Sequence, residues 1–189
     1  MGIVSKAIFS CILLFSSLPM KSENTFSCHL QSIKIIGKTN ISSFYFTYNQ
    51  SQGKNLTQNC VTQSELISFN VPVKSFENRN EQMKEDFYQL LKASSYPEIE
   101  VKLDKARLLK VAEDHAIEEL PVQIYLAGEN QKVSCICYTS TSNNTQFLIE
   151  GYTHVRLKDF NLEPPKKMLG AVQVKEKILI KFDVIISSI

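Results

Sequence analysis

The stretch that decides the fold is 71–103, which reads VPVKSFENRNEQMKEDFYQLLKASSYPEIEVKL. Apolar and polar residues alternate through 67–73 as it begins, which is typical of a half-buried strand. The period then becomes helical, and alternation returns at 99–103. We therefore predict a strand, one main helix near 79–93 and a second strand. The apolar face of the helix gathers Met83, Phe87, Leu90 and Leu91.

The predicted helix has recognisable ends. Asn78 can serve as its N-cap, and Glu81 three residues later gives a start that resembles a capping box. Tyr96 precedes Pro97, and a residue before proline is disfavoured in the helical conformation.

The rest of the chain is dominated by alternating segments that predict strands, with Gly37 at a turn or bulge after the first of them. Segment 105–113, KARLLKVAE, is compatible with a strand or a short helix, and we predict a strand that continues the sheet. The fold class is therefore mainly β, an antiparallel β-barrel or curved sheet of about eight strands with one main α-helix. Such a barrel can hold one small ligand. The other predicted strands lie near 30–36, 44–48, 120–126, 133–139, 147–157 and 178–186.

The first 22 residues have the pattern of a signal peptide. Lys6 is followed by an apolar run of 12 residues over 7–18, which is too short to span a membrane. Cys11 lies inside this run rather than after it, which argues against a lipid-anchored protein. We expect export to the periplasm or beyond, and a single domain over 28–187.

The charge of the remaining chain is balanced. Of 21 basic residues, removal of Lys6 and Lys21 leaves 19, equal to the 19 acidic residues. The charges are interspersed, so we expect neither nucleic acid nor an anionic membrane surface as a partner.

Four cysteines remain after residue 22, and an even number in an exported protein predicts disulfides. Cys135 and Cys137 share one face of a predicted strand, where a direct bond would be strained. We favour a Cys28–Cys60 disulfide with Cys135 and Cys137 free. The alternative is four reduced cysteines packed as small hydrophobes.

Motifs for catalysis or metal binding give no support to an enzyme. None of the three histidines has the spacing of a metal site, and neither a G-x-S-x-G nor a Walker loop is present. The acidic corner at 113–119 could suggest a metal site, but we interpret it as a solvated hairpin loop. We expect no catalytic residues, no metal and no cofactor.

Three segments resemble the YceI-like family of exported lipid- or polyisoprenoid-binding proteins. They are the stretch 71–103, the segment IIGKTNISSF at 35–44, and HVRLKDFNLEPPKKMLGAVQVKEKILIKFDVII at 154–186. The version with two adjacent prolines is similar to members from Bacteroidetes-type bacteria. DFN stands here where the family often has DFG, and the four cysteines are not part of the family motif.

The resemblance implies an extended antiparallel lipocalin-like β-barrel whose apolar pocket holds a long isoprenoid tail. Two functions remain open: a non-enzymatic carrier of a polyisoprenoid or other long-chain lipid, and an interaction protein whose barrel is filled by its own side chains. The oligomeric state, monomer or homodimer, is left open. From the alternation we predict that the ligand is lined by Phe69, Val71, Phe87, Leu91, Val101, Leu120, Val122, Ile124 and Leu126.

Overall fold

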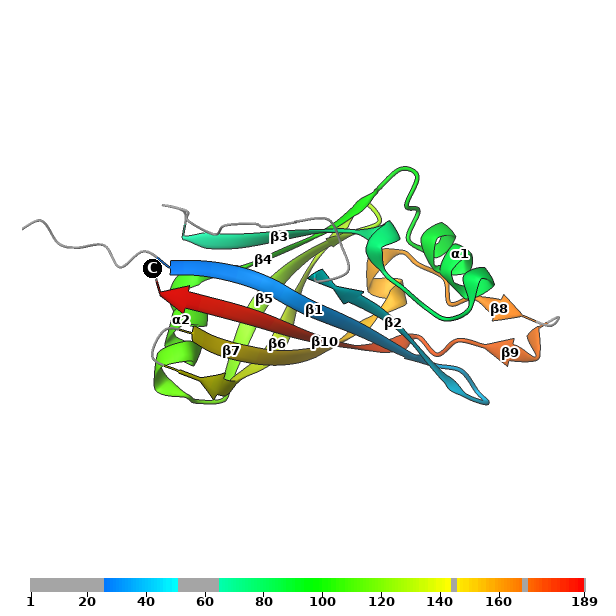
Figure 1. Ribbon diagram of the computed structural model, residues 1–189. Helices are drawn as coiled ribbons and strands as arrows, with labels where there is room; N and C mark the ends of the chain where they lie inside the picture. Colours follow the sequence, from blue (N-terminus) through cyan, green and yellow to red (C-terminus); the bar gives the residue numbers. More distant parts are fainter. Residues whose placement is uncertain (1–25, 51–64, 144–145, 168–169, 189) are drawn as a thin grey trace, which may run out of the picture.

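A computed structural model describes residues 26–50, 65–143, 146–167 and 170–188. An eight-stranded antiparallel sheet curls around a central axis, with a helix at each end (Figure 1). The strand order is β2-β1-β10-β7-β6-β5-β4-β3. The strands of this sheet are β1 (Phe26–Lys38), β2 (Ser43–Asn49), β3 (Leu66–Pro72), β4 (Glu98–Asp104), β5 (Glu118–Leu126), β6 (Glu129–Ser142), β7 (Gln146–Arg156) and β10 (Lys177–Ser188).

Strands that follow one another in the chain are neighbours in this sheet except β2 and β3, which form its two edges, and the last strand, β10, lies beside the first. It pairs with β1 on one side and with β7 on the other. Between the two edges, β2 and β3, the described residues contain one backbone bridge, which joins β2 to the segment that follows β3 and the short 3-10 helix at 73–75. There the Thr47 N–H donates to the Glu77 carbonyl at 3.0 Å, and the Glu77 N–H donates to the Thr47 carbonyl at 2.8 Å. The sheet is thus curled into a barrel shape whose seam is pinned at this point. The prediction of an antiparallel, lipocalin-like sheet of about eight strands is confirmed.

The main helix, α1 (Glu81–Leu90), follows the short 3-10 helix η2 (Val73–Ser75). Its N-cap is Asn80, whose side chain accepts from the Met83 N–H at 3.0 Å, so the prediction of Asn78 was wrong. Asn78 instead donates to the Tyr45 carbonyl at 2.6 Å and accepts from the Asn80 N–H at 2.8 Å. Asn78 therefore ties the approach to α1 against β2 and aligns the residue that caps the helix.

A second helix, α2 (Lys105–Asp114), occupies the segment predicted as a strand, and that prediction was wrong. Asp104 caps it by accepting from the Arg107 N–H at 2.9 Å. Leu108, Val111 and Ala112 lie at helical spacing and are buried against the sheet. The chain gains more burial by folding over the end of the sheet than by extending β4.

The turn or bulge predicted at Gly37 does not form there. Gly37 lies within β1, opposite Phe44, and not at a turn. The β5–β6 hairpin turns at Ala127 and Gly128, both with positive φ, as a two-residue hairpin of primed type requires. Two further short segments were missed: the 3-10 helix η3 (Leu157–Phe160), and a small hairpin of β8 (Lys166–Lys167) and β9 (Val172–Gln173).

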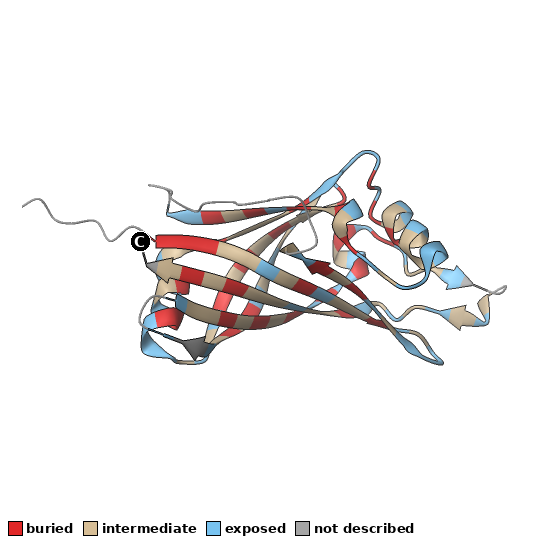
Figure 2. Ribbon diagram, viewed as in Figure 1, coloured by how far each residue is buried: buried red, intermediate tan, exposed pale blue. Residues whose placement is uncertain are grey.

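The interior differs between the two ends of the sheet. At the α2 end, close to the C-terminus, many residues of the strands and of α2 are buried (Figure 2). The Thr139 hydroxyl donates to the Val111 carbonyl at 2.8 Å and ties α2 to β6. This end is a filled core built from Cys28, Ile67, Leu108, Val111, Ile149 and Ile186.

Candidate functional site

A cavity begins where the filled core ends and runs toward α1. The space inside it that the centre of a water molecule can reach has a volume of about 250 Å³. By comparison, an engineered apolar cavity of about 150 Å³ stays dry and binds benzene. This space is therefore large enough for an apolar ligand and is bounded at one end by the filled core.

The cavity wall is almost wholly apolar. All eight strands of the main sheet contribute to it, and α1 covers one side with Met83, Phe87, Leu90 and Leu91. The polar residues in the lining, thiols aside, are Thr39, Asp86 and Thr153. Such a wall favours an alkyl or isoprenoid chain over a polar ligand, because a polar group placed there would lose its hydrogen bonds to water.

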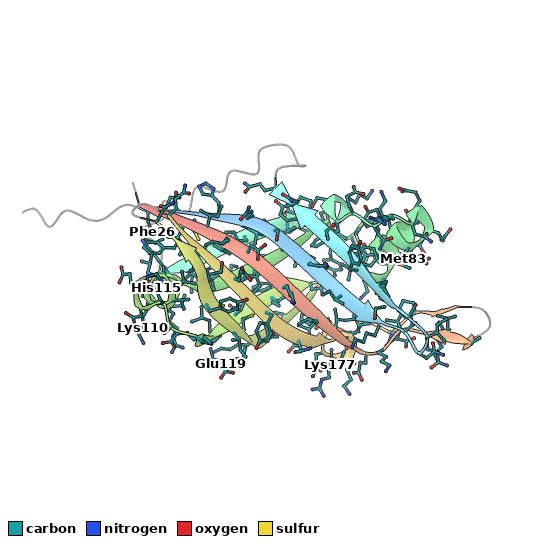
Figure 3. The ribbon with its side chains drawn as sticks, turned by 60° about the horizontal axis from the view of Figure 1, so that its bottom comes forward. Phe26, Met83, Lys110, His115, Glu119 and Lys177 are labelled. Carbon is teal, nitrogen blue, oxygen red and sulfur yellow. The ribbon has the colours of Figure 1, made fainter. Side chains whose placement is uncertain are left out.

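The mouth of the cavity lies at the α1 end. Thr39 comes from the β1–β2 turn, and Pro165, Val172 and Val174 come from the β8–β9 region, so both hairpins border the opening. Met83 lies at this end, whereas Phe26, Lys110 and His115 lie toward the other (Figure 3). In the part of the chain that the structure describes, the cavity opens beside α1 and ends at the filled core toward α2.

An aromatic cluster fixes α1 over the sheet. Phe87 of α1 stacks on Phe46 of β2 with ring centroids 4.1 Å apart and planes inclined by 20°. Phe76 lies 5.6 Å from Phe87 and 6.0 Å from Tyr48. Ring pairs at these distances add stabilisation beyond the area they bury. The cluster thus forms a firm wall beside the seam.

Two glycines let large aromatic rings lie flat against the wall. A Cβ on Gly151 would stand 2.1 Å from a ring carbon of Phe182, and a Cβ on Gly37 would stand 2.2 Å from one of Phe44. Each ring covers the cross-strand glycine directly opposite it. Both phenylalanines line the cavity, so this arrangement keeps their bulk out of its centre.

The deep part of the cavity carries two thiols. Cys135 and Cys137 are free, buried and on the same face of β6. Burial raises the pKa of Cys135 to about 11 and that of Cys137 to about 12. Both groups stay neutral near pH 7, so they act as small apolar surface rather than as thiolate nucleophiles. Nearby, the Thr153 hydroxyl donates to the Ser134 carbonyl at 2.7 Å, which satisfies that buried donor.

The structure brings most of the predicted lining residues together. Val71 and Leu120 are buried but do not line the cavity. Both belong to the packed hydrophobic core, so the structure does not place them in the lining. The predicted residues that do line the cavity are Phe69, Phe87, Leu91, Val101, Val122, Ile124 and Leu126.

Sequence reasoning missed most of the wall. Phe44 and Phe46 of β2 and Phe182 and Val184 of β10 all line the cavity. Their alternation was visible in the sequence, but nothing there showed that β10 lies between β1 and β7. The missed residues became neighbours of the predicted ones only through that pairing.

The other candidate sites have simple structural accounts. Cys28 is buried in β1 and Cys60 lies outside the described residues, so their disulfide stays a prediction. In the acidic segment 113–119, which we interpreted as a solvated loop, Glu118 forms an ion pair with Lys110 at 3.0 Å. His115 ends α2 in the left-handed conformation. Within the described ranges, no cluster of three or more His, Cys, Asp or Glu residues is placed to hold a metal ion.

Neither helix of the described segments is both long and apolar enough to cross a bilayer.

Three solved structures are similar to this fold. A polyisoprenoid-binding domain from Saccharophagus degradans, implicated in plant cell wall breakdown, superimposes with a TM-score of 0.67 at 10% identity. The match covers 88% of this chain and 100% of that one. Burkholderia cenocepacia BcnA gives 0.57 at 11% identity over 82% of this chain and 94% of its own. The Campylobacter jejuni YceI protein gives 0.51 at 9% identity over 96% and 97%.

None of the curated proteins compared with the chain matches it. The model of the YceI-like domain, in contrast, matches residues 18–186, which is most of the sequence. At these low identities the structural matches show the fold, while the domain match shows descent. The chain belongs to the YceI-like family.

Proposed function

We propose that this protein is an exported, non-enzymatic binding protein that holds a long apolar chain, a polyisoprenoid or another lipid, inside the curled sheet. The observation that carries the proposal is the blind cavity, lined by apolar side chains from all eight strands. Burial of each CH₂ group of a ligand in such a wall contributes about 0.8 kcal/mol. The solved relative from Saccharophagus degradans, a polyisoprenoid-binding domain, supports the same class of ligand.

The distribution of polar groups favours one orientation of the ligand. The blind end presents apolar groups and neutral thiols, whereas Thr39 and Asp86 lie at the mouth. The tail would therefore enter first and the polar end would stay near water. The raised pKa values of Cys135 and Cys137 agree with a binding role, because a thiol must ionise to act as a nucleophile. The apolar run at 7–18 supports export.

The alternative, a barrel filled by its own side chains, describes only the α2 end. A substitution distinguishes the two functions. Ile124 lines the cavity, so Ile124→Phe places added volume in empty space. We expect the lipid-free variant to unfold at nearly the same free energy as wild type but to retain less lipid. Urea unfolding and native mass spectrometry of the purified protein measure these two quantities.

The matched control is Leu108→Phe, which adds the same ring to the filled core. Leu108 is fully buried and does not line the cavity. We expect this variant to lose about 1–3 kcal/mol of stability through overpacking and to keep its lipid. If wild type carries no lipid and Ile124→Phe destabilises as much as the control does, the carrier function is rejected.

A further inference from the structure

The two hairpins at the mouth of the cavity form one continuous surface. We define the hairpin rim as residues 38–43, 164–167 and 170–175. Asn40 joins its two parts: its side-chain amide donates to the Ala171 carbonyl at 2.9 Å, and its side-chain oxygen accepts from the Gln173 N–H at 3.1 Å. The Lys175 N–H also donates to the Lys38 carbonyl at 2.7 Å. The rim is therefore held together by backbone and side-chain bonds around the opening.

The charge of the hairpin rim is of one sign. These residues include four lysines and no aspartate or glutamate. Lys38, Lys166 and Lys175 are exposed. The opposite side of the mouth is different, because α1 carries three acidic residues, Glu81, Glu85 and Asp86, and a single lysine, Lys84, which forms an ion pair with Glu81 at 3.0 Å. Overall neutrality thus hides a local basic surface on one side of the opening.

The hairpin rim also presents an apolar side chain to the solvent. Ile41, in the β1–β2 turn, is 73% exposed. Behind it, Thr39, Val172 and Val174 continue directly into the apolar cavity wall. An exposed aliphatic tip flanked by lysines combines the two interactions that attract a protein to an anionic lipid surface.

We propose that the hairpin rim docks on an anionic lipid membrane, with Ile41 among the acyl chains and the lysines against the headgroups. This inference rests on the proposed function, because docking would place the mouth where a lipid tail can pass from bilayer to cavity without crossing water. The acidic side of α1 would face away from the membrane. The expectation that anionic membranes are not partners, drawn from net charge, does not apply to this surface.

Vesicle co-sedimentation tests the docking. The probes are vesicles of phosphatidylcholine alone and vesicles that also contain phosphatidylglycerol. We expect the wild-type protein to sediment with the anionic vesicles, to sediment much less with the neutral ones, and to be released by salt. Replacing Lys38, Lys166 and Lys175 by Gln should lower partitioning about 100-fold, the equivalent of about 1 kcal/mol per lysine. The control replaces three exposed cations away from the mouth, Arg107, Lys110 and Lys181, by Gln and should bind like wild type.

Ile41 has its own matched control at the opposite end. Ile117 follows α2 and is 75% exposed. We expect Ile41→Ser to weaken sedimentation with anionic vesicles and Ile117→Ser to leave it unchanged. Both side chains are exposed, so both variants should keep wild-type thermal stability. All variants carry the same N-terminal segment, so a difference between them reflects the substituted residue.

The outcomes separate docking from lipid binding. The lysine variant should still carry lipid in native mass spectrometry, because no substituted residue lines the cavity. The inference is overturned if wild type ignores anionic vesicles, if both triple variants lose binding equally, or if Ile117→Ser is the more impaired isoleucine variant. Lipid-loaded protein that fails to dock rejects only the docking surface. Protein that docks through the rim but carries no lipid rejects the proposed function instead.

Discussion

At the scale of single residues, the width of the cavity depends on two glycines, because each lacks the Cβ atom that would push the phenylalanine opposite it into the cavity. A cross-strand aromatic ring normally projects from the sheet, because the Cβ of its neighbour occupies the space beside the backbone. Gly37 and Gly151 leave that space to the rings of Phe44 and Phe182. The alternating pattern predicted which side chains face inward, but a glycine opposite an aromatic ring becomes visible only when the strand register is known.

Gly151→Ala should narrow the cavity. The new Cβ would stand 2.1 Å from a ring carbon of Phe182, so the ring must swing toward the cavity. We expect a loss of about 1–3 kcal/mol in stability, measured by urea unfolding, and less bound lipid by native mass spectrometry. The double variant Gly151→Ala/Phe182→Leu should recover both, because leucine lacks the ring that clashes. Unchanged lipid content in the single variant would show that this ring does not limit the cavity.

At the scale of elements, the sequence predicted α1 and missed α2. Both helices carry an apolar face and lie between alternating strands, but only α1 is followed by a proline that marks where the helix must end. Segment 105–113 is short, and its apolar pattern is compatible with a strand as well as with a helix. The deciding feature is Asp104, which ends β4 and caps α2. An aspartate just before a run of good helix formers is a helix-start signal that favoured the correct interpretation.

Asp104→Ala should weaken the closed end of the sheet. The side chain accepts from the Arg107 N–H, and loss of an N-cap costs about 1 kcal/mol. Asp104→Asn keeps an accepting oxygen at the same place and should retain most of the stability. Urea unfolding of the two variants measures the difference. Equal destabilisation by Ala and Asn would show that the charge of Asp104, and not its cap, stabilises the helix.

At the scale of the whole molecule, apolar content and strand count predicted a barrel, but not that half of its interior would be full. The same kinds of side chain, Ile, Leu and Val, fill the α2 end and line the hollow end. The difference arises because α2 inserts Leu108 and Val111 between the strands, while α1 covers its end with an aromatic cluster that leaves the mouth beside it open. Since α2 itself was not predicted, the blind end of the cavity could not be predicted either.

This division predicts how ligand and mutation affect thermal stability. A ligand that binds only the folded state at about 100 times its Kd stabilises it by about 2.7 kcal/mol, which corresponds to roughly 5–10 °C in Tm for a domain of this size. We expect a polyprenol added to delipidated wild-type protein to raise Tm in that range. Leu108→Phe should lower Tm with and without the polyprenol and keep the shift, because it disturbs only the filled end. Ile124→Phe should leave the lipid-free Tm nearly unchanged and reduce the shift, because it occupies the ligand's space. A shift that shrinks equally in both variants would mean that the two ends are coupled and that the filled core is part of the binding site.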